Sequence, residues 1–243
     1  MCIRDSLYPV DSSGDGQELS SQLLQILSES SGDGDTAEPT ERWDGRDVVL
    51  ITYADTIGDK GGPGLQALKS FVNRHLQPFA AVIHVLPFLE STSDGGFAVA
   101  SHTKLEQRFG DWSDLAALAQ GRRLMSDLVL NHVSASHPWV QQFMRDEQPG
   151  RSCVLEAAPD ACWADVVRPR SSNLFTQLRG PVGARQVWTT FGPDQVDLNW
   201  RSAEVLLGFA RLMQRMARHG VRWIRLDACL LYTSPSPRDH EQS

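Results

Sequence analysis

At residues 221–228 the chain reads VRWIRLDA, and the fold class follows from this stretch and from what precedes it. Its apolar residues predict a strand that ends at a carboxylate, Asp227, with Arg225 two residues earlier. Residues two apart on a strand share a face, so both side chains are expected to project toward one site. A carboxylate beside a guanidinium stays ionised and is held in one orientation, as a nucleophile requires. A structural ion pair at a strand end gives the same pattern.

Strand and helix patterns alternate along the chain before this stretch. The expected strands and helices are residues 48–53, 65–76, 80–86, 114–119, 123–130, 205–216 and 221–227. The first strand is a continuous apolar run, which is expected of a strand buried on both faces. Repeated strand–helix units predict an α/β fold with a parallel sheet and right-handed crossovers. Residues 132–185 show no clean period, and a connection of that length is usually functional.

Bulk properties exclude several classes of protein. The chain has 243 residues, a net charge of -7 and a pI near 5.5, which argues against nucleic-acid binding. No apolar run reaches the roughly 20 residues of a membrane span, so no membrane partner is expected. The four cysteines lack CxxC spacing and no Cys/His cluster suggests zinc, so no metal site is expected. Without a visible secretory signal, a cytoplasmic setting is the default expectation.

Polar residues follow each expected strand, at the end where α/β sheets build their sites. His132 is either a donor to a polar substrate or a loop-edge histidine satisfied by its neighbours. Asp94 precedes two glycines, so it is either presented with Phe97 to a cavity or part of an ordinary Asp-Gly turn, which the spacing alone favours. Asp127 is expected to fix backbone or neighbouring loops.

Two further segments offer candidate binding residues. Arg168 and Arg170 flank a proline and could contact phosphate or another anion, although solvated surface pairs have the same sequence. Phe191 and Gln195 lie in a segment that combines an aromatic wall with amide donors. Aromatic faces with converging polar groups suit sugar binding, and they suit packing as well.

These segments together carry a family resemblance. Residues 225–228 (RLDA) and 127–132 (DLVLNH) resemble the fourth- and third-strand motifs of the alpha-amylase superfamily, glycoside hydrolase family 13. The resemblance is narrower for the sucrose phosphorylase-like enzymes and covers about residues 42–228 in order. It is carried by LITYAD (50–55), HVLPF (84–88), DGGF (94–97), FGDW (109–112), RPR (168–170), VWTTF (187–191) and QVDL (195–198). Ser101 departs from the family, which usually has an aspartate there.

The resemblance implies a retaining double displacement in which Asp227 is the nucleophile that forms a β-glucosyl-enzyme and Arg225 orients it. Asp94 and His132 would hold hydroxyls of the glucosyl unit. Phe97 and Phe191 would form an apolar wall beside the reacting carbon, with Gln195 lining the same pocket.

The partners implied are a small-molecule glucoside and inorganic phosphate, with no metal or organic cofactor. Arg168 or Arg170 would lie near the acceptor, where phosphate replaces water. The variants around residues 189–191 and 197–199 resemble the branch acting on glucosylglycerate or sucrose phosphate. A hydrolase or transglucosidase using water or sugar as acceptor, and a non-catalytic sugar-binding remnant, are the competing functions.

The resemblance also implies the fold, a (β/α)₈ TIM barrel, of which this chain would hold about the first four strand–helix units with an excursion after the third strand. Such a barrel needs about 250 residues, and the family's acid/base glutamate and its transition-state-stabilising aspartate follow later strands. We therefore expect a catalytic half-barrel that is inactive by itself. The expected division is 1–6 artefact, 7–46 extension with one helix (17–29) and a linker (30–40), 47–228 half-barrel with loop subdomain 132–185, and 229–243 artefact resembling adapter read-through.

Overall fold

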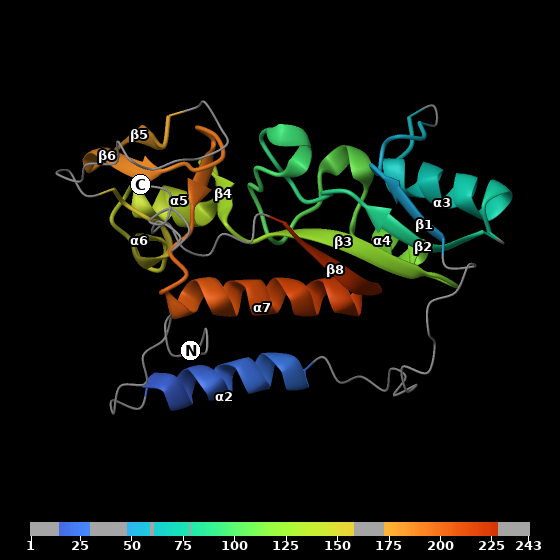
Figure 1. Cartoon of the computed structure of the whole chain (residues 1–243), viewed down its shortest axis with the longest axis horizontal. Coiled ribbons are helices and arrows are strands. Elements are labelled where there is room, and N and C mark those ends of the chain that lie inside the picture. Colours follow the sequence, from blue (N-terminus) through green and yellow to red (C-terminus); the bar gives the residue numbers. More distant parts are fainter. Residues whose placement is uncertain (1–14, 30–47, 59–60, 78, 158–172, 228–243) are drawn as a thin grey trace, which may run out of the picture.

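The centre of the molecule is a four-stranded parallel sheet in the order β1-β2-β3-β8 (Figure 1). The computed structural model describes residues 15–29, 48–58, 61–77, 79–157 and 173–227. The strands are β1 (Val48–Thr52), β2 (Ala80–Val85), β3 (Arg123–Val129) and β8 (Val221–Asp227). Each strand lies beside its successor in the sheet, as in the first four strands of a (β/α)₈ barrel, and β1 and β8 form the two edges of this open sheet. The predicted partial barrel is confirmed.

Helices connect the strands and cover the sheet. They are α3 (Gly64–His75), α4 (Trp112–Leu118) and α7 (Ala203–Arg218), with the short 3₁₀ turns η1 (Asp94–Gly96) and η2 (Gln107–Phe109) between β2 and α4. Helix α7 buries Val205, Phe209, Leu212 and Met216, a spacing that places them on one face. Helix α4 begins two residues earlier than its apolar pattern predicts, because Asp111 caps it by accepting hydrogen bonds from the first-turn N–H groups.

Strand β1 is more exposed than its sequence predicts. The side chains of Val48, Val49 and Ile51 are exposed, and within the strand only Thr52 is buried. Strand β2, by contrast, is buried along nearly its whole length. The prediction that the first strand is buried on both faces is therefore wrong for this chain. The physical reason is that β1 is an edge strand, with β2 as its single partner in the sheet.

Between β3 and α7 the chain leaves the sheet and builds a separate cluster of short elements, seen at one end of the sheet in Figure 1. They are β4 (His132–Ser134), α5 (Pro138–Phe143), α6 (Gly150–Cys153), β5 (Phe175–Gly180), β6 (Gly183–Trp188) and β7 (Gln195–Asp197). Strand β4 pairs antiparallel with β7, and β5 with β6. None of these described elements exceeds six residues, which explains why no period is visible in the sequence.

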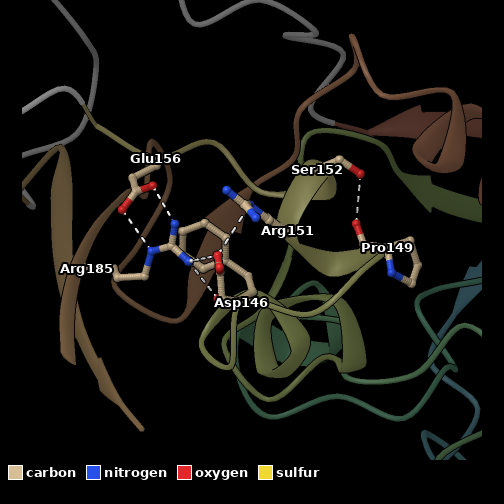
Figure 2. A network of polar contacts seen from close by, with 7 residues as sticks. Asp146, Pro149, Arg151, Ser152, Glu156 and Arg185 are labelled. Carbon is tan, nitrogen blue, oxygen red and sulfur yellow. Dashed lines mark hydrogen bonds and ion pairs between the residues drawn. The ribbon is translucent and has the colours of Figure 1, made fainter. Parts of the chain in front are cut away.

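The β5–β6 hairpin is fastened to α5 and its following loop by one arginine (Figure 2). Arg185 donates through Nε and Nη2 to the two carboxylate oxygens of Glu156, at 2.9 and 2.8 Å. Its Nη1 donates to the carbonyl of Phe143 at 2.8 Å and lies 3.5 Å from a carboxylate oxygen of Asp146. The same guanidinium stacks 3.8 Å from the centroid of the Phe143 ring. The hairpin is thereby held against α5 at its buried residue Phe143.

Helix α2 (Asp15–Ser28) lies beside α7, outside the sheet (Figure 1). The helix expected at 17–29 is thus present. Ile26 is buried in this contact, its carbonyl accepts a hydrogen bond from Gln214, and Arg218 donates to the carbonyl of Glu29 at 3.0 Å. Within the described ranges, none of the helices combines the length and apolarity that a membrane crossing needs. The expected linker and the segments 1–6 and 229–243 lie outside the described residues.

Candidate active site

Asp227 is the last residue of β8, opposite Val129 of β3, at the C-terminal end of the sheet. Its carboxyl group is half-buried, and this burial raises its pKa above the ordinary value. The positive charge of Arg225 opposes the rise, whereas the negative charges of Asp127 and Asp94 add to it. Candidate residues from three distant parts of the chain therefore act electrostatically on one carboxylate.

Arg225 makes its hydrogen bond to Asp127, not to Asp227. Its Nε–H donates to one carboxylate oxygen of Asp127, which is its neighbour across the β3–β8 pair. The other oxygen of Asp127 lies 3.0 Å from Nε2 of His84 on β2. Because a carboxylate can only accept, His84 donates through Nε2–H. The expectation that Asp127 fixes backbone or loops is wrong, because both its oxygens bind side chains of the neighbouring strands.

Gln195, at the start of β7, joins two of the predicted sugar-binding residues. Its side-chain amide donates to Asp94 at 2.8 Å and contacts Nε2 of His132 at 3.1 Å. Gln195 and His132 are buried, whereas Asp94 is exposed. The pairing of β4 with β7 brings Gln195 and His132 together although 63 residues separate them in sequence. The three side chains form one polar cluster.

The Asp94 loop adopts a left-handed backbone conformation that requires glycine at position 96. Asp94 has a φ of 55°, and Gly96 has a φ of 104°, both in the left-handed region. A Cβ atom on Gly96 would lie 2.7 Å from Cβ of Pro87, so only glycine fits against the end of β2. The segment is a tight Asp-Gly turn, and within it Asp94 accepts a hydrogen bond from Gln195. That Asp94 and Phe97 are presented to a cavity stays a prediction.

Asp194 holds this loop in place and was not identified from the sequence. Its carboxylate accepts hydrogen bonds from the hydroxyl of Ser93 at 2.7 Å, from that of Ser134 at 3.1 Å and from the backbone N–H of Ala135 at 3.1 Å. Burial raises the pKa of Asp194, but the hydroxyl bonds from Thr92 and Ser93 outweigh it and the net shift is downward. In the sequence, the feature that points to Asp194 is its position directly before Gln195.

Aromatic side chains border the polar cluster. The ring of Phe191 lies 5.1 Å from that of His132, centroid to centroid, at a tilt of 44°. Phe97 packs against the hydrophobic core directly after the Asp94 turn. Arg168 and Arg170 lie outside the described residues. In the part of the chain that the structure describes, no group of three His, Cys, Asp or Glu side chains could hold a metal ion.

The arrangement combines a half-buried carboxylate, a cluster of hydrogen-bonding groups and apolar rings at one end of a parallel sheet. A carboxylate held beside a guanidinium is suited to nucleophilic attack, and the Asp94, His132 and Gln195 cluster is suited to hydroxyl groups. The described side chains thus bring a half-buried carboxylate and a cluster of hydrogen-bonding groups together near the C-terminal end of the sheet.

Comparison of this chain with known proteins identifies a matching family and several relatives. Residues 78–243 match the family model described as the alpha amylase catalytic domain. A glucosylglycerate phosphorylase of Allomeiothermus silvanus is 42% identical over 186 residues, which is 76% of this chain and 34% of that protein. A sucrose phosphorylase of Agrobacterium vitis is 34% identical over 193 residues, 74% of this chain and 39% of that protein. The crystal structure of a sucrose 6F-phosphate phosphorylase from Thermoanaerobacter thermosaccharolyticum superposes with a TM-score of 0.70 at 24% identity, covering 85% of this chain and 46% of that one. The chain spans between a third and two-fifths of the length of the curated relatives named here.

Proposed function

Because the chain belongs to the alpha-amylase catalytic-domain family, we propose that it is the N-terminal part of a retaining glucoside phosphorylase. The whole protein would transfer a glucosyl unit from a small glucoside to inorganic phosphate. The observation that carries the proposal is the position of Asp227, which is half-buried at the end of β8. The charges of Arg225, Asp127 and Asp94 act on its carboxyl group there.

In the first step an oxygen of the Asp227 carboxylate attacks C1 of the glucosyl unit. The bond from C1 to the leaving oxygen breaks with its electron pair, that oxygen takes a proton from a general acid, and a glucosyl ester forms. In the second step an oxygen of hydrogen phosphate attacks C1 and passes its proton to the conjugate base of the same general acid, the bond from C1 to the Asp227 carboxyl oxygen breaks, and the carboxylate is regenerated. Two inversions give retention, so the product is glucose 1-phosphate with the donor's configuration.

The polar cluster supplies the donor pocket in this proposal. Asp94 accepts hydrogen bonds from glucosyl hydroxyl groups, and His132 and Gln195 contribute the neighbouring hydrogen-bonding atoms. The three are already joined by hydrogen bonds before substrate arrives, so little reorganisation is needed on binding. Phe191 and Phe97 exclude water beside C1. Excluding water favours phosphate as the acceptor, since water would otherwise hydrolyse the ester.

Glucosylglycerate is the donor that we propose first. Among the relatives reported above, the one named glucosylglycerate phosphorylase is more similar to this chain than the one named sucrose phosphorylase, at 42% against 34% identity. Arg168 and Arg170 are proposed to bind the acceptor phosphate, because guanidinium groups match its geometry.

The test is phosphorolysis by the whole protein. Glucosylglycerate, sucrose and sucrose 6-phosphate are supplied in turn with inorganic phosphate, and release of glucose 1-phosphate is measured. We expect turnover that depends on phosphate and is fastest with glucosylglycerate. Release of free glucose at the same rate without phosphate would instead establish a hydrolase, and transfer to a second sugar would establish a transglucosidase.

For the 243-residue chain alone we propose no turnover. Its described sheet has four strands and is open, with Asp227 on the edge strand β8. Losing general-acid assistance alone costs roughly 10²–10⁴-fold in rate. Robust phosphorolysis by the purified chain would contradict this.

A further inference from the structure

We propose that His84 is a positioning residue for the nucleophile: by occupying one oxygen of Asp127, it leaves Arg225 a single bond to that carboxylate and keeps the guanidinium beside Asp227. The inference rests on the proposed function, because it takes Asp227 as the nucleophile. His84 itself does not touch the substrate in this account.

The three side chains form a line across three adjacent strands. Asp127 on β3 and Arg225 on β8 are directly paired in the parallel register. His84 on β2 is paired with Met125, two residues before Asp127 and on the same face of β3. The imidazole therefore reaches along the strand direction to the carboxylate, with Nε2 at 3.0 Å from Oδ2.

Burial makes this line sensitive to the loss of one member. His84 is 1% exposed and the side chain of Asp127 is 0% exposed, whereas that of Arg225 is 40% exposed. A buried carboxylate oxygen that loses its donor must find another, because water cannot reach it. Arg225 already donates to the other oxygen of Asp127, and the fork of a guanidinium can bind both oxygens of one carboxylate.

Without His84 the guanidinium would therefore turn toward Asp127 and form a two-bond fork. That rotation moves its charge away from Asp227. The charged groups that act on Asp227 are Arg225, which lowers its pKa, and Asp127 and Asp94, which raise it in addition to burial. Moving the Arg225 charge away removes the interaction that lowers the pKa of Asp227. The pKa of Asp227 then rises further, and less of the carboxyl group is ionised.

The test is a ¹³C NMR titration of the Asp227 carboxyl carbon in the 243-residue chain, which requires no catalysis. For His84→Leu, which removes the donor, we expect the pKa of Asp227 to rise by about half to one unit. His84→Gln places an N–H near the position of Nε2 and should restore the original value. Val82→Ala, at a fully buried position on the same face of β2, is the control for lost stability and should not shift it.

An unchanged pKa of Asp227 in His84→Leu, or an equal rise in Val82→Ala, would overturn the proposal. Should the leucine variant fail to fold, His84→Asn replaces it, since its shorter amide cannot reach Asp127 and the same rise is expected. The proposed function fails separately: if Asp227→Asn in the whole protein still turned over, Asp227 would not be the nucleophile, whatever the titration gave.

Discussion

Replacing Arg185 by methionine tests how the β5–β6 hairpin is held to α5 and the loop that follows it. The substitution keeps most of the aliphatic stem but removes the guanidinium, with its two bonds to Glu156 and its bond to the carbonyl of Phe143. The side chain of Arg185 is 18% exposed and that of Glu156 is 43% exposed. The network is therefore partly screened by solvent.

The expected loss follows from its separate contacts. The half-exposed pair with Glu156 contributes about 0.5–1 kcal/mol. The hydrogen bond to the carbonyl of buried Phe143 contributes about 1–1.5 kcal/mol, and the stacking on its ring about 0.5 kcal/mol. We expect the free energy of unfolding to fall by about 2–3 kcal/mol, which lowers Tm by roughly 5–10 °C for a chain of this length.

The assay is urea unfolding of the chain at low micromolar concentration, followed by tryptophan fluorescence. Arg179→Met is the matched control, because Arg179 lies on the partner strand β5, is exposed and has no hydrogen bond or ion pair among the described residues. Its loss should cost less than about 0.5 kcal/mol. Equal destabilisation by the two variants would refute the argument that the Arg185 contacts fasten the hairpin.

Three further outcomes are expected. Burial lowers the pKa of His102 to about 4 and that of His137 to about 2, so both are neutral in the fold. The unfolded chain then binds more protons below its ordinary histidine pKa of about 6.5, and stability should fall by about 3 kcal/mol from pH 7.5 to 5.5; equal urea midpoints at the two values would contradict this. In the whole protein, Gln195→Leu should raise KM for the glucosyl donor about tenfold, equivalent to about 1.4 kcal/mol, because Asp94 and His132 lose their shared partner; an unchanged KM in initial-rate assays would count against the cluster as the donor pocket. The edge of β1, which has β2 as its single neighbour in the described sheet, should make the isolated chain associate as its concentration rises; a single monomeric boundary in sedimentation velocity at all concentrations would be the opposite result.

The sheet was predictable from the sequence, but its exposure was not. The four apolar runs and the helices between them are where the periods indicate. The pattern of β1 does not reveal that Ile51 is 58% exposed, because an apolar run does not distinguish an edge strand from a central one. The hairpin β5–β6 escaped prediction because no residue of β5 is fully buried and the burial of β6 does not alternate along the strand.

For the candidate site, the sequence indicated that three polar side chains lie close together, but not how the charged side chains pair. Gln195, Asp94 and His132 were each expected in one pocket, and their hydrogen bonds bring them together. The bond from Arg225 to Asp127 was not foreseen, since it depends on the register of β3 against β8. Cross-strand partners of this kind cannot be read from spacing along one strand.

The central claim is that Asp227 forms the bond to the glucosyl unit. It is tested most directly by mixing the whole protein with a glucosyl donor in the absence of phosphate, quenching with acid and mapping the peptides by mass spectrometry. The account predicts a hexose ester on the peptide that carries Asp227, lost when phosphate is added before quenching. A hexose on another residue, or full turnover by Asp227→Asn, would contradict it.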